Sequence, residues 1–252
     1  MTDRIPLIAG NWKMYKTLPE AVQTAMRLAE RVSVSTPEVM IAPSFISLAS
    51  VFDVLRSTPI ALGAQNIFWE TEGAFTGEIS PAMLKSTGCR YVIIGHSERR
   101  QIFAETDEAV HKKIAAVLAA EMSPILCIGE TESQRDQNQT FMVLDKQIHL
   151  ALDEFSASQI QCLVIAYEPV WAIGTGKTAS TGQIQEVHGF IRQWLAKRYN
   201  NALANSIRIL YGGSVKPQNI VDIMALPDVD GALVGGASLQ PESFYSIISY
   251  NQ

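Results

Sequence analysis

Three side chains that could take part in proton transfer follow short apolar runs of the 252-residue sequence. Glu168 follows Leu-Val-Ile-Ala-Tyr, His96 follows Tyr-Val-Ile-Ile-Gly, and Lys13 comes shortly after Leu-Ile-Ala-Gly. A carboxylate can act as a base, an imidazole can donate a hydrogen bond, and an ammonium group can stabilise a developing oxyanion. If folding brings these three groups together, they suit proton abstraction next to a carbonyl group.

Two glycine pairs near the C-terminus indicate a phosphate site. Gly212-Gly213 follows one apolar run and precedes Ser214, and Gly235-Gly236 follows the next run. Because glycine has no Cβ atom, its backbone N–H can approach an anion closely, and Ser214 adds a hydroxyl donor. In closed barrels the loops after the seventh and eighth strands often hold phosphate, so both pairs together favour phosphate over simple tight turns.

The elements that must position these groups alternate along the chain. Short, β-branched-rich runs predict buried strands at Ile5–Gly10, Val39–Ala42, Ile60–Ala64, Tyr91–Ile94, Ile125–Ile128, Leu163–Tyr167, Ile207–Tyr211 and Ala232–Val234. Helical spacing predicts helices at Pro19–Val32, Ile46–Arg56, Pro81–Thr87, Asp107–Ala120, Thr140–Phe155, Gly182–Tyr199, Pro217–Ala225 and Pro241–Ser249. Asp107 and Thr140 are the predicted N-caps of their helices.

This alternation predicts an α/β fold, a closed (β/α)8 barrel that occupies residues 1–252 as a single domain. An open doubly wound sheet stays as the alternative, because alternation does not prove closure. In a closed barrel the carboxyl ends of the strands meet at one rim. The candidate catalytic side chains and both glycine pairs all follow strands, so we expect them at that rim.

Two irregular stretches interrupt the rhythm. Residues 65–80 are long for a connection after a strand, where about 2–6 residues are usual, and they carry Phe68, Trp69 and Phe75. An exposed loop with three aromatic side chains favours self-association, with packing onto its own barrel as the alternative. Residues 168–181 begin with the predicted base, Glu168, and their small residues after Pro-Val-Trp indicate a hinged lid.

Composition and the remaining motifs exclude several classes of protein. The chain has 20 Lys and Arg against 25 Asp and Glu, a net charge of −5, which argues against a nucleic-acid or membrane partner. No apolar run approaches the length of a bilayer span, and no secretory signal is recognised. Residues 174–179 fit two nucleotide-binding motifs only loosely, because the required spacing fails in both. Three unpaired cysteines and the lack of a metal-ligand cluster predict a reducing compartment and no metal.

Seven stretches, in order along nearly the whole chain, resemble the triosephosphate isomerase family. They are Ala9–Met14, Gly73–Glu78, Ile94–Arg100, Cys127–Thr131, Ala166–Gly176, Tyr211–Val215 and Asp230–Ala237. The resemblance implies interconversion of dihydroxyacetone phosphate and D-glyceraldehyde 3-phosphate without a cofactor, in glycolysis and gluconeogenesis, in the cytoplasm. The family is a standard example of an enzyme whose loop closes as a lid over the substrate, and the resemblance implies that this loop is Pro169–Ala179.

The resemblance also implies a role for each matching residue. Glu168 would be the base, His96 the neutral electrophile, and Lys13 and Asn11 would polarise the substrate oxygens. The phosphate would be held by Gly174, Ser214, Gly235 and Gly236, and Glu98 and Cys127 would support the site.

The family is usually homodimeric, which implies that loop 65–80 reaches the site of a second subunit. Thr76 would then contact the region of Asn11, and Gln65 would lie in the contact. Tyr15 stands where many members have Asn, and we expect it to face the partner loop. Other phosphate-binding barrel enzymes, such as an aldolase, and a catalytically silent barrel remain alternatives. The first would be expected to have a lysine within a strand, and the second would be expected to lack Glu168, His96 or Lys13.

Overall fold

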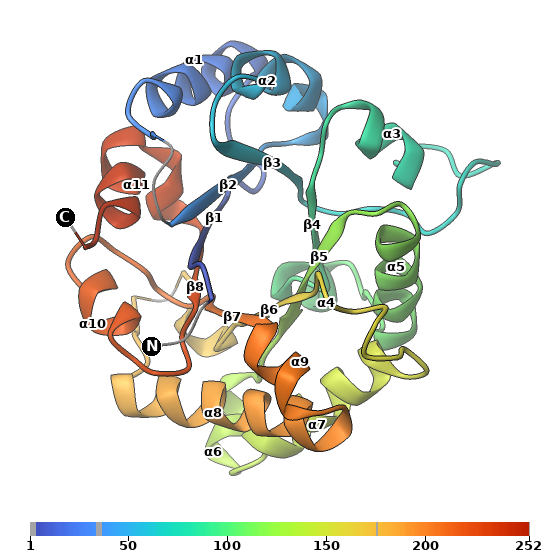
Figure 1. Ribbon diagram of the computed structural model, residues 1–252, viewed down its shortest axis with the longest axis vertical. Coiled ribbons are helices and arrows are strands. Elements are labelled where there is room, and N and C mark those ends of the chain that lie inside the picture. The colour runs from blue at the N-terminus through green and yellow to red at the C-terminus, as the bar shows by residue number, and fades with distance from the viewer. Residues whose placement is uncertain (1–3, 34–36, 175, 252) are drawn as a thin grey trace.

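Eight parallel strands close into a barrel surrounded by helices in this computed structural model (Figure 1). The structure describes residues 4–33, 37–174 and 176–251. Neighbouring strands follow the order of the sequence, and β8 pairs with β1 from Leu7 opposite Gly231 to Gly10 opposite Val234. This last pairing confirms the closed (β/α)8 barrel and excludes the open sheet.

The strands are buried on both faces, which explains why they read as apolar runs. They are β1 Leu7–Asn11, β2 Glu38–Ala42, β3 Ile60–Ala64, β4 Tyr91–Ile94, β5 Ser123–Ile128, β6 Val164–Tyr167, β7 Arg208–Tyr211 and β8 Gly231–Val234. Alternate residues, such as Leu7 and Ala9, pack inside the barrel, whereas Ile8 packs against the helices. The first strand begins at Leu7 and not at the predicted Ile5, since Pro6 has no N–H to donate.

The helices form the outer layer. They are α1 Leu18–Ala29, α2 Leu48–Leu55, α3 Pro81–Ser86, α4 Ser97–Ile102, α5 Asp107–Ala119, α6 Glu132–Asp136, α7 Thr140–Leu152, α8 Thr181–Arg198, α9 Asn201–Ser206, α10 Ile220–Met224 and α11 Pro241–Ile248. Three 3-10 turns, η1 Phe45–Ser47, η2 Val170–Ala172 and η3 Gly236–Leu239, complete the set for the described residues. No described helix has the length and apolarity needed to cross a membrane.

Several boundaries differ from the sequence predictions. The N-caps predicted at Asp107 and Thr140 are wrong, because Thr106 and Gln139 occupy those positions one residue earlier. The Thr106 hydroxyl accepts the N–H of Ala109 at 3.2 Å and so caps the helix. Asp107 lies inside the first turn and is therefore not the cap residue. Sequence analysis missed the short helices α4, α6 and α9, although it predicted α3 and α10, which are equally short.

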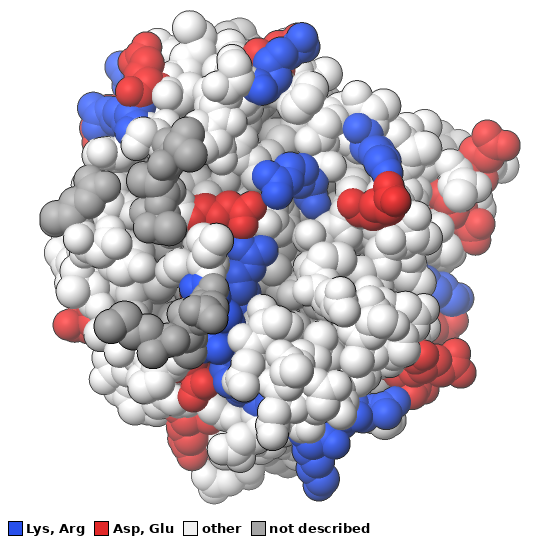
Figure 2. All heavy atoms as spheres, in the orientation of Figure 1, with Lys and Arg blue, Asp and Glu red and all other residues white. Residues whose placement is uncertain are grey.

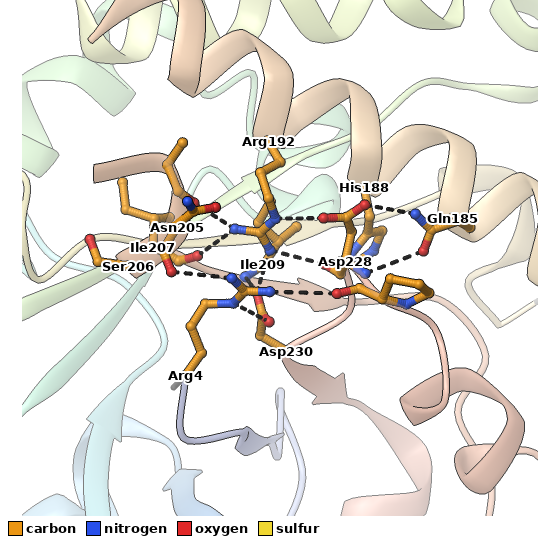
Figure 3. Close-up of polar contacts among 12 residues, drawn as sticks. Arg4, Gln185, His188, Arg192, Asn205, Ser206, Ile207, Ile209, Asp228 and Asp230 are labelled. Carbon is orange, nitrogen blue, oxygen red and sulfur yellow. Dashed lines mark hydrogen bonds and ion pairs between the residues drawn. The ribbon is translucent and has the colours of Figure 1, made fainter. Parts of the chain in front are cut away.

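The amino-terminal ends of the strands are joined by buried ion pairs. In Figure 1 this end faces the viewer, with α9 in front and α4 behind, and Figure 2 shows basic and acidic side chains interspersed on this face. Figure 3 shows Asp230, which precedes β8, between Arg192 of α8 at 2.6 Å and Arg4 at 2.5 Å. The Asp230 carboxylate also accepts the N–H of Ile209 in β7. These contacts reinforce a seam where β7 and β8 pair only through Tyr211 and Ala232 among the described residues.

Loop 65–80 connects β3 to α3 and extends outward from the barrel (Figure 1). Its base is fixed by a hydrogen bond from the Phe68 N–H to the Ile79 carbonyl at 2.9 Å. Residues 70–78 are all exposed. The protruding part of the loop therefore packs little against its own barrel.

Candidate active site

A cavity of about 730 Å³ opens at the carboxyl ends of the strands. Nine of the predicted catalytic, substrate-binding and supporting residues line it: Asn11, Lys13, His96, Glu98, Glu168, Gly174, Ser214, Gly235 and Gly236. They lie at or after the ends of five strands, β1, β4, β6, β7 and β8, and the closed barrel brings them to one rim. Tyr15 also lines this cavity.

Glu168 follows β6 and is buried, with 2% of its surface exposed. One carboxylate oxygen, Oε1, lies 3.0 Å from Nε2 of His96, and Oε2 accepts the backbone N–H of Ser97 at 2.8 Å. Burial alone would raise the pKa of this carboxyl. The His96 imidazole, the Ser97 N–H and the Lys13 ammonium outweigh burial and lower the pKa below its ordinary value. The Glu168 carboxyl is therefore ionised at neutral pH.

His96 follows β4 and stands at the N-cap of α4. Its Nδ1 accepts the backbone N–H of Glu98 at 3.2 Å, so this nitrogen carries no proton and Nε2 carries it. Burial lowers the pKa of His96, but the charge of Glu168 outweighs burial and raises the pKa in this arrangement. When the carboxylate moves away, burial favours a neutral imidazole with an Nε2–H donor facing the cavity.

Lys13 is held in an unusual backbone conformation, with φ at +50°. Its N–H donates to Oδ1 of Asn11 at 3.0 Å, and its carbonyl accepts from Nε2 of Gln65 at 2.8 Å. These two bonds fix the turn that directs the lysine toward the rim. The Lys13 ammonium pairs with the Glu98 carboxylate at 2.5 Å, so Glu98 positions this cation beside the cavity.

The backbone on one side of the cavity can hold an anion. Ser214, Gly235 and Gly236 line this side, together with Gly212 and Gly213, and Lys13 lies next to Gly235. A Cβ atom at Gly212 would come within 2.9 Å of the Glu168 side chain, so glycine is required for the carboxylate to lie where it does. The cradle and the base therefore share one wall.

The segment predicted as a lid borders the same cavity. Ile173, Gly174 and Gly176 line it, whereas Thr175 lies outside the described residues. Gly174 and Gly176 have φ values of +70° and +82°, which favour glycine. Trp171 donates its indole N–H to Glu130 at 3.0 Å, and the Arg135 guanidinium lies 5.1 Å above its ring. These contacts anchor the amino-terminal part of the lid to the end of β5 and to α6.

Three predicted residues do not line the main cavity. Cys127 lies inside the barrel near Glu168, and burial followed by that negative charge raises the pKa of its thiol well above the ordinary value. Gln65 contacts the Lys13 turn of its own chain, and Thr76 lies on the exposed part of loop 65–80. A second cavity of about 220 Å³, lined by Gln65, opens on the other side of Lys13 and Glu98.

Sequence analysis missed four contributors to the site. The Ser97 N–H holds the base, Glu130 and Arg135 anchor the lid, and Lys216 adds a cation to the wall of the cavity. Ser97 acts through its backbone, which leaves no signal in residue type. Glu130 follows β5, and its residue type does not reveal that Trp171 is its partner. Among the described residues, no group of three or more His, Cys, Asp or Glu could hold a metal ion.

A closed parallel barrel with a buried carboxylate, an imidazole and an ammonium group beside an anion cradle defines the class: a (β/α)8-barrel enzyme equipped for proton transfer. The sequence profile of the triosephosphate isomerase family matches residues 6–251. The chain therefore belongs to the triosephosphate isomerase family.

Individual relatives agree with this assignment. The triosephosphate isomerase of Endomicrobium trichonymphae is 54% identical over 250 residues, which cover 99% of this chain and all of the relative. That of Chloroflexus aurantiacus is 53% identical over 249 residues, covering 98% of this chain and 99% of the relative. The crystal structure of the enzyme from Bartonella henselae superposes with a TM-score of 0.88 at 39% identity, covering 97% of this chain and 98% of that one.

Proposed function

We propose that this chain interconverts dihydroxyacetone phosphate and D-glyceraldehyde 3-phosphate, a reaction of glycolysis and gluconeogenesis. The observation that carries the proposal is the buried pair of Glu168 and His96, 3.0 Å apart, which opens into a cavity beside an anion cradle. The pair supplies a base and a neutral hydrogen-bond donor on one wall, as a proton shift between adjacent carbons requires. The family relationship supplies the substrate.

The reaction begins with Glu168 leaving its resting partners. Both of its oxygens are bound by the protein, through His96 and the Ser97 N–H, so the carboxylate must exchange these contacts for the substrate C–H. Pro169, the first residue of the lid, is adjacent in sequence, and lid movement is therefore transmitted to the base. Glu168 then takes a proton from one carbon and returns it to the neighbouring carbon.

The negative charge of the enediolate develops on the substrate oxygens. The Nε2–H of His96, the ammonium of Lys13 and the side chain of Asn11 face the cavity and stabilise this charge. Because Nδ1 of His96 accepts the Glu98 N–H, the imidazole donates from Nε2 only. Burial of the pair keeps water from weakening these interactions.

The phosphate is held by the cradle that adjoins the base. Backbone N–H groups of Gly174, Gly235 and Gly236 and the Ser214 hydroxyl surround the phosphate. Closure of Pro169–Ala179 brings Gly174 onto the phosphate and excludes water from the enediolate. The residues of the chain supply every step, and the reaction uses no cofactor.

Replacement of the base by a shorter acid tests the assignment. Glu168→Asp withdraws the carboxylate by one methylene and is expected to lower kcat at least about a hundredfold, while the chain stays folded. Glu186→Asp, an exposed position on α8, is the matched control and should keep full activity. Isomerisation is followed through a coupled dehydrogenase with chelator in excess. Near-normal turnover by Glu168→Asp would refute the role of the base.

We also propose that the chain acts as a homodimer, with loop 65–80 of each subunit in the second cavity of the other. That cavity borders Lys13 and Glu98, so in a single subunit one side of the catalytic lysine faces solvent. The exposed side chains of Met14 and Phe103 line it, as expected of an interface. Thr76, Gln65 and Tyr15 would lie in or near the contact. Sedimentation at micromolar concentration tests this, and a fully active monomer would contradict it.

The remaining assignments follow from the family. The whole of residues 1–252 is proposed to be one catalytic domain, since the family profile spans residues 6–251. A cytoplasmic location is proposed because the family acts on glycolytic intermediates. Fractionation of cells that express the chain tests the location.

A further inference from the structure

Loop 65–80 contains an aromatic cluster that packs on itself. The rings of Phe68 and Trp69 stack with centroids 4.1 Å apart and an interplanar angle of 30°, and Phe75 lies 4.6 Å from Phe68. Gly73 has a φ of +146°, and a Cβ atom there would come within 2.7 Å of the Phe75 ring. Glycine thus lets Phe75 fold back over the loop to reach the stack.

Two adjacent lysines of α5 connect this loop to the barrel. The Lys113 ammonium is buried and donates to Asn66 at 2.7 Å, which fixes the base of the loop. The Lys112 ammonium lies 5.5 Å from the centre of the Trp69 ring, a cation–π contact with the aromatic stack. The stack is therefore attached to the barrel by the same helix that holds the loop base.

Without this attachment the exposed residues 70–78 would have to become ordered when a partner binds. Fixing the backbone costs roughly 1–2 kcal/mol for each residue, and a loop already held in its bound shape avoids much of that cost. We infer that Phe68, Trp69 and Phe75, with Lys112, preorganise loop 65–80 for insertion into a second copy of this chain. This inference rests on the homodimer proposed above.

Charge and position on the two surfaces indicate a second copy as the occupant. The loop carries Glu70, Glu72 and Glu78, and the second cavity has on its walls two cations, Lys13 and Arg99, which pair with Glu98 and Glu105 of their own chain. The same cavity borders His96 and Glu98, so the inserted loop covers the back of the catalytic site. Trp69 is then a positioning residue for the reaction in the partner, and it touches no substrate.

The test measures dimer dissociation and specific activity of the full chain against protein concentration. Trp69→Ala removes the stack and the cation–π contact, and it is expected to raise the dimer dissociation constant at least about tenfold. At high concentration its specific activity should return to that of the wild type. Trp69→Phe keeps the stack and should recover most of the affinity, whereas Lys112→Met should show a smaller loss.

Phe141→Ala is the control, because Phe141 also pairs with an aromatic ring, Phe190, at 4.9 Å, but on α7 and α8. It should leave the dissociation constant unchanged. An unchanged dimer dissociation constant in Trp69→Ala would overturn the inference. A loss of specific activity that is equal at all protein concentrations would also overturn it, because such a loss indicates a folding defect only. A wild-type chain that is monomeric and fully active would instead refute the homodimer itself.

Discussion

Replacement of Arg192 by Met should destabilise the barrel without altering its chemistry. The guanidinium of Arg192 pairs with Asp228 at 2.7 Å and with Asp230 at 2.6 Å (Figure 3). It also donates to the carbonyls of Ala204 and Ile207 at 2.6 and 3.1 Å. Met fills a similar volume but satisfies none of these acceptors, and its side chain would lie where only 11% of the arginine is exposed.

The size of the stability loss depends on which contacts of the buried carboxylates remain in Arg192→Met. Removing one partner of a buried ion pair typically costs about 3–5 kcal/mol, because the other charge remains buried. Asp230 keeps Arg4 at 2.5 Å and the Ile209 N–H, so we expect the lower end, about 3 kcal/mol. For a chain of this length that corresponds to a fall in Tm of roughly 6–12 °C.

The assay compares thermal unfolding of Arg192→Met and of the wild type at one protein concentration. Arg27→Met is the control, since Arg27 and Glu242 form an exposed pair at 3.9 Å, and its Tm should change by no more than about 1–2 °C. Below the transition, kcat/KM of Arg192→Met should match the wild type, because the network lies at the end of the barrel opposite the cavity. A Tm within about 2 °C of the wild type would refute the reasoning.

Two further predictions concern buried titratable groups. Burial lowers the pKa of His188 to about 4, so this histidine is neutral in the folded chain and takes up a proton more readily when unfolded. The contribution of His188 to the free energy of unfolding is fully present above about pH 6.5. It is lost as the pH falls toward 4, and the total loss is about 3 kcal/mol. When urea unfolding is measured at several pH values, the free energy of unfolding should fall less steeply with decreasing pH in His188→Gln than in the wild type. An equal pH dependence in the two proteins would contradict the lowered pKa of His188. Burial also raises the pKa of Cys89 to about 11 and that of Cys127 still further, whereas Cys162 is exposed. A thiol reagent at pH 8 should therefore modify one cysteine rapidly in the folded chain and all three after unfolding. Rapid modification of all three cysteines in the folded chain would refute this prediction.

The order and positions of the main elements could be predicted from the sequence. β3 and β4 were predicted at their observed bounds, because a strand buried on both faces is a local apolar run that needs no knowledge of its partners. The same reasoning placed Glu168, His96 and Lys13 at strand ends, and the structure confirms that these residues line one cavity. The resemblance to the triosephosphate isomerase family is confirmed as well.

The tertiary structure decided what depends on partners distant in the sequence. Closure of the sheet is a pairing of β1 with β8, more than 220 residues apart, and alternation alone could not distinguish it from an open sheet. The hydrogen bond from the Ser97 N–H to Glu168 and that from Trp171 to Glu130 are long-range contacts of the same kind. Residue type and spacing determined which groups could do chemistry, since they are local properties. Their distances, their protonation and the anchoring of the lid arise only when the closed barrel brings separate strand ends together.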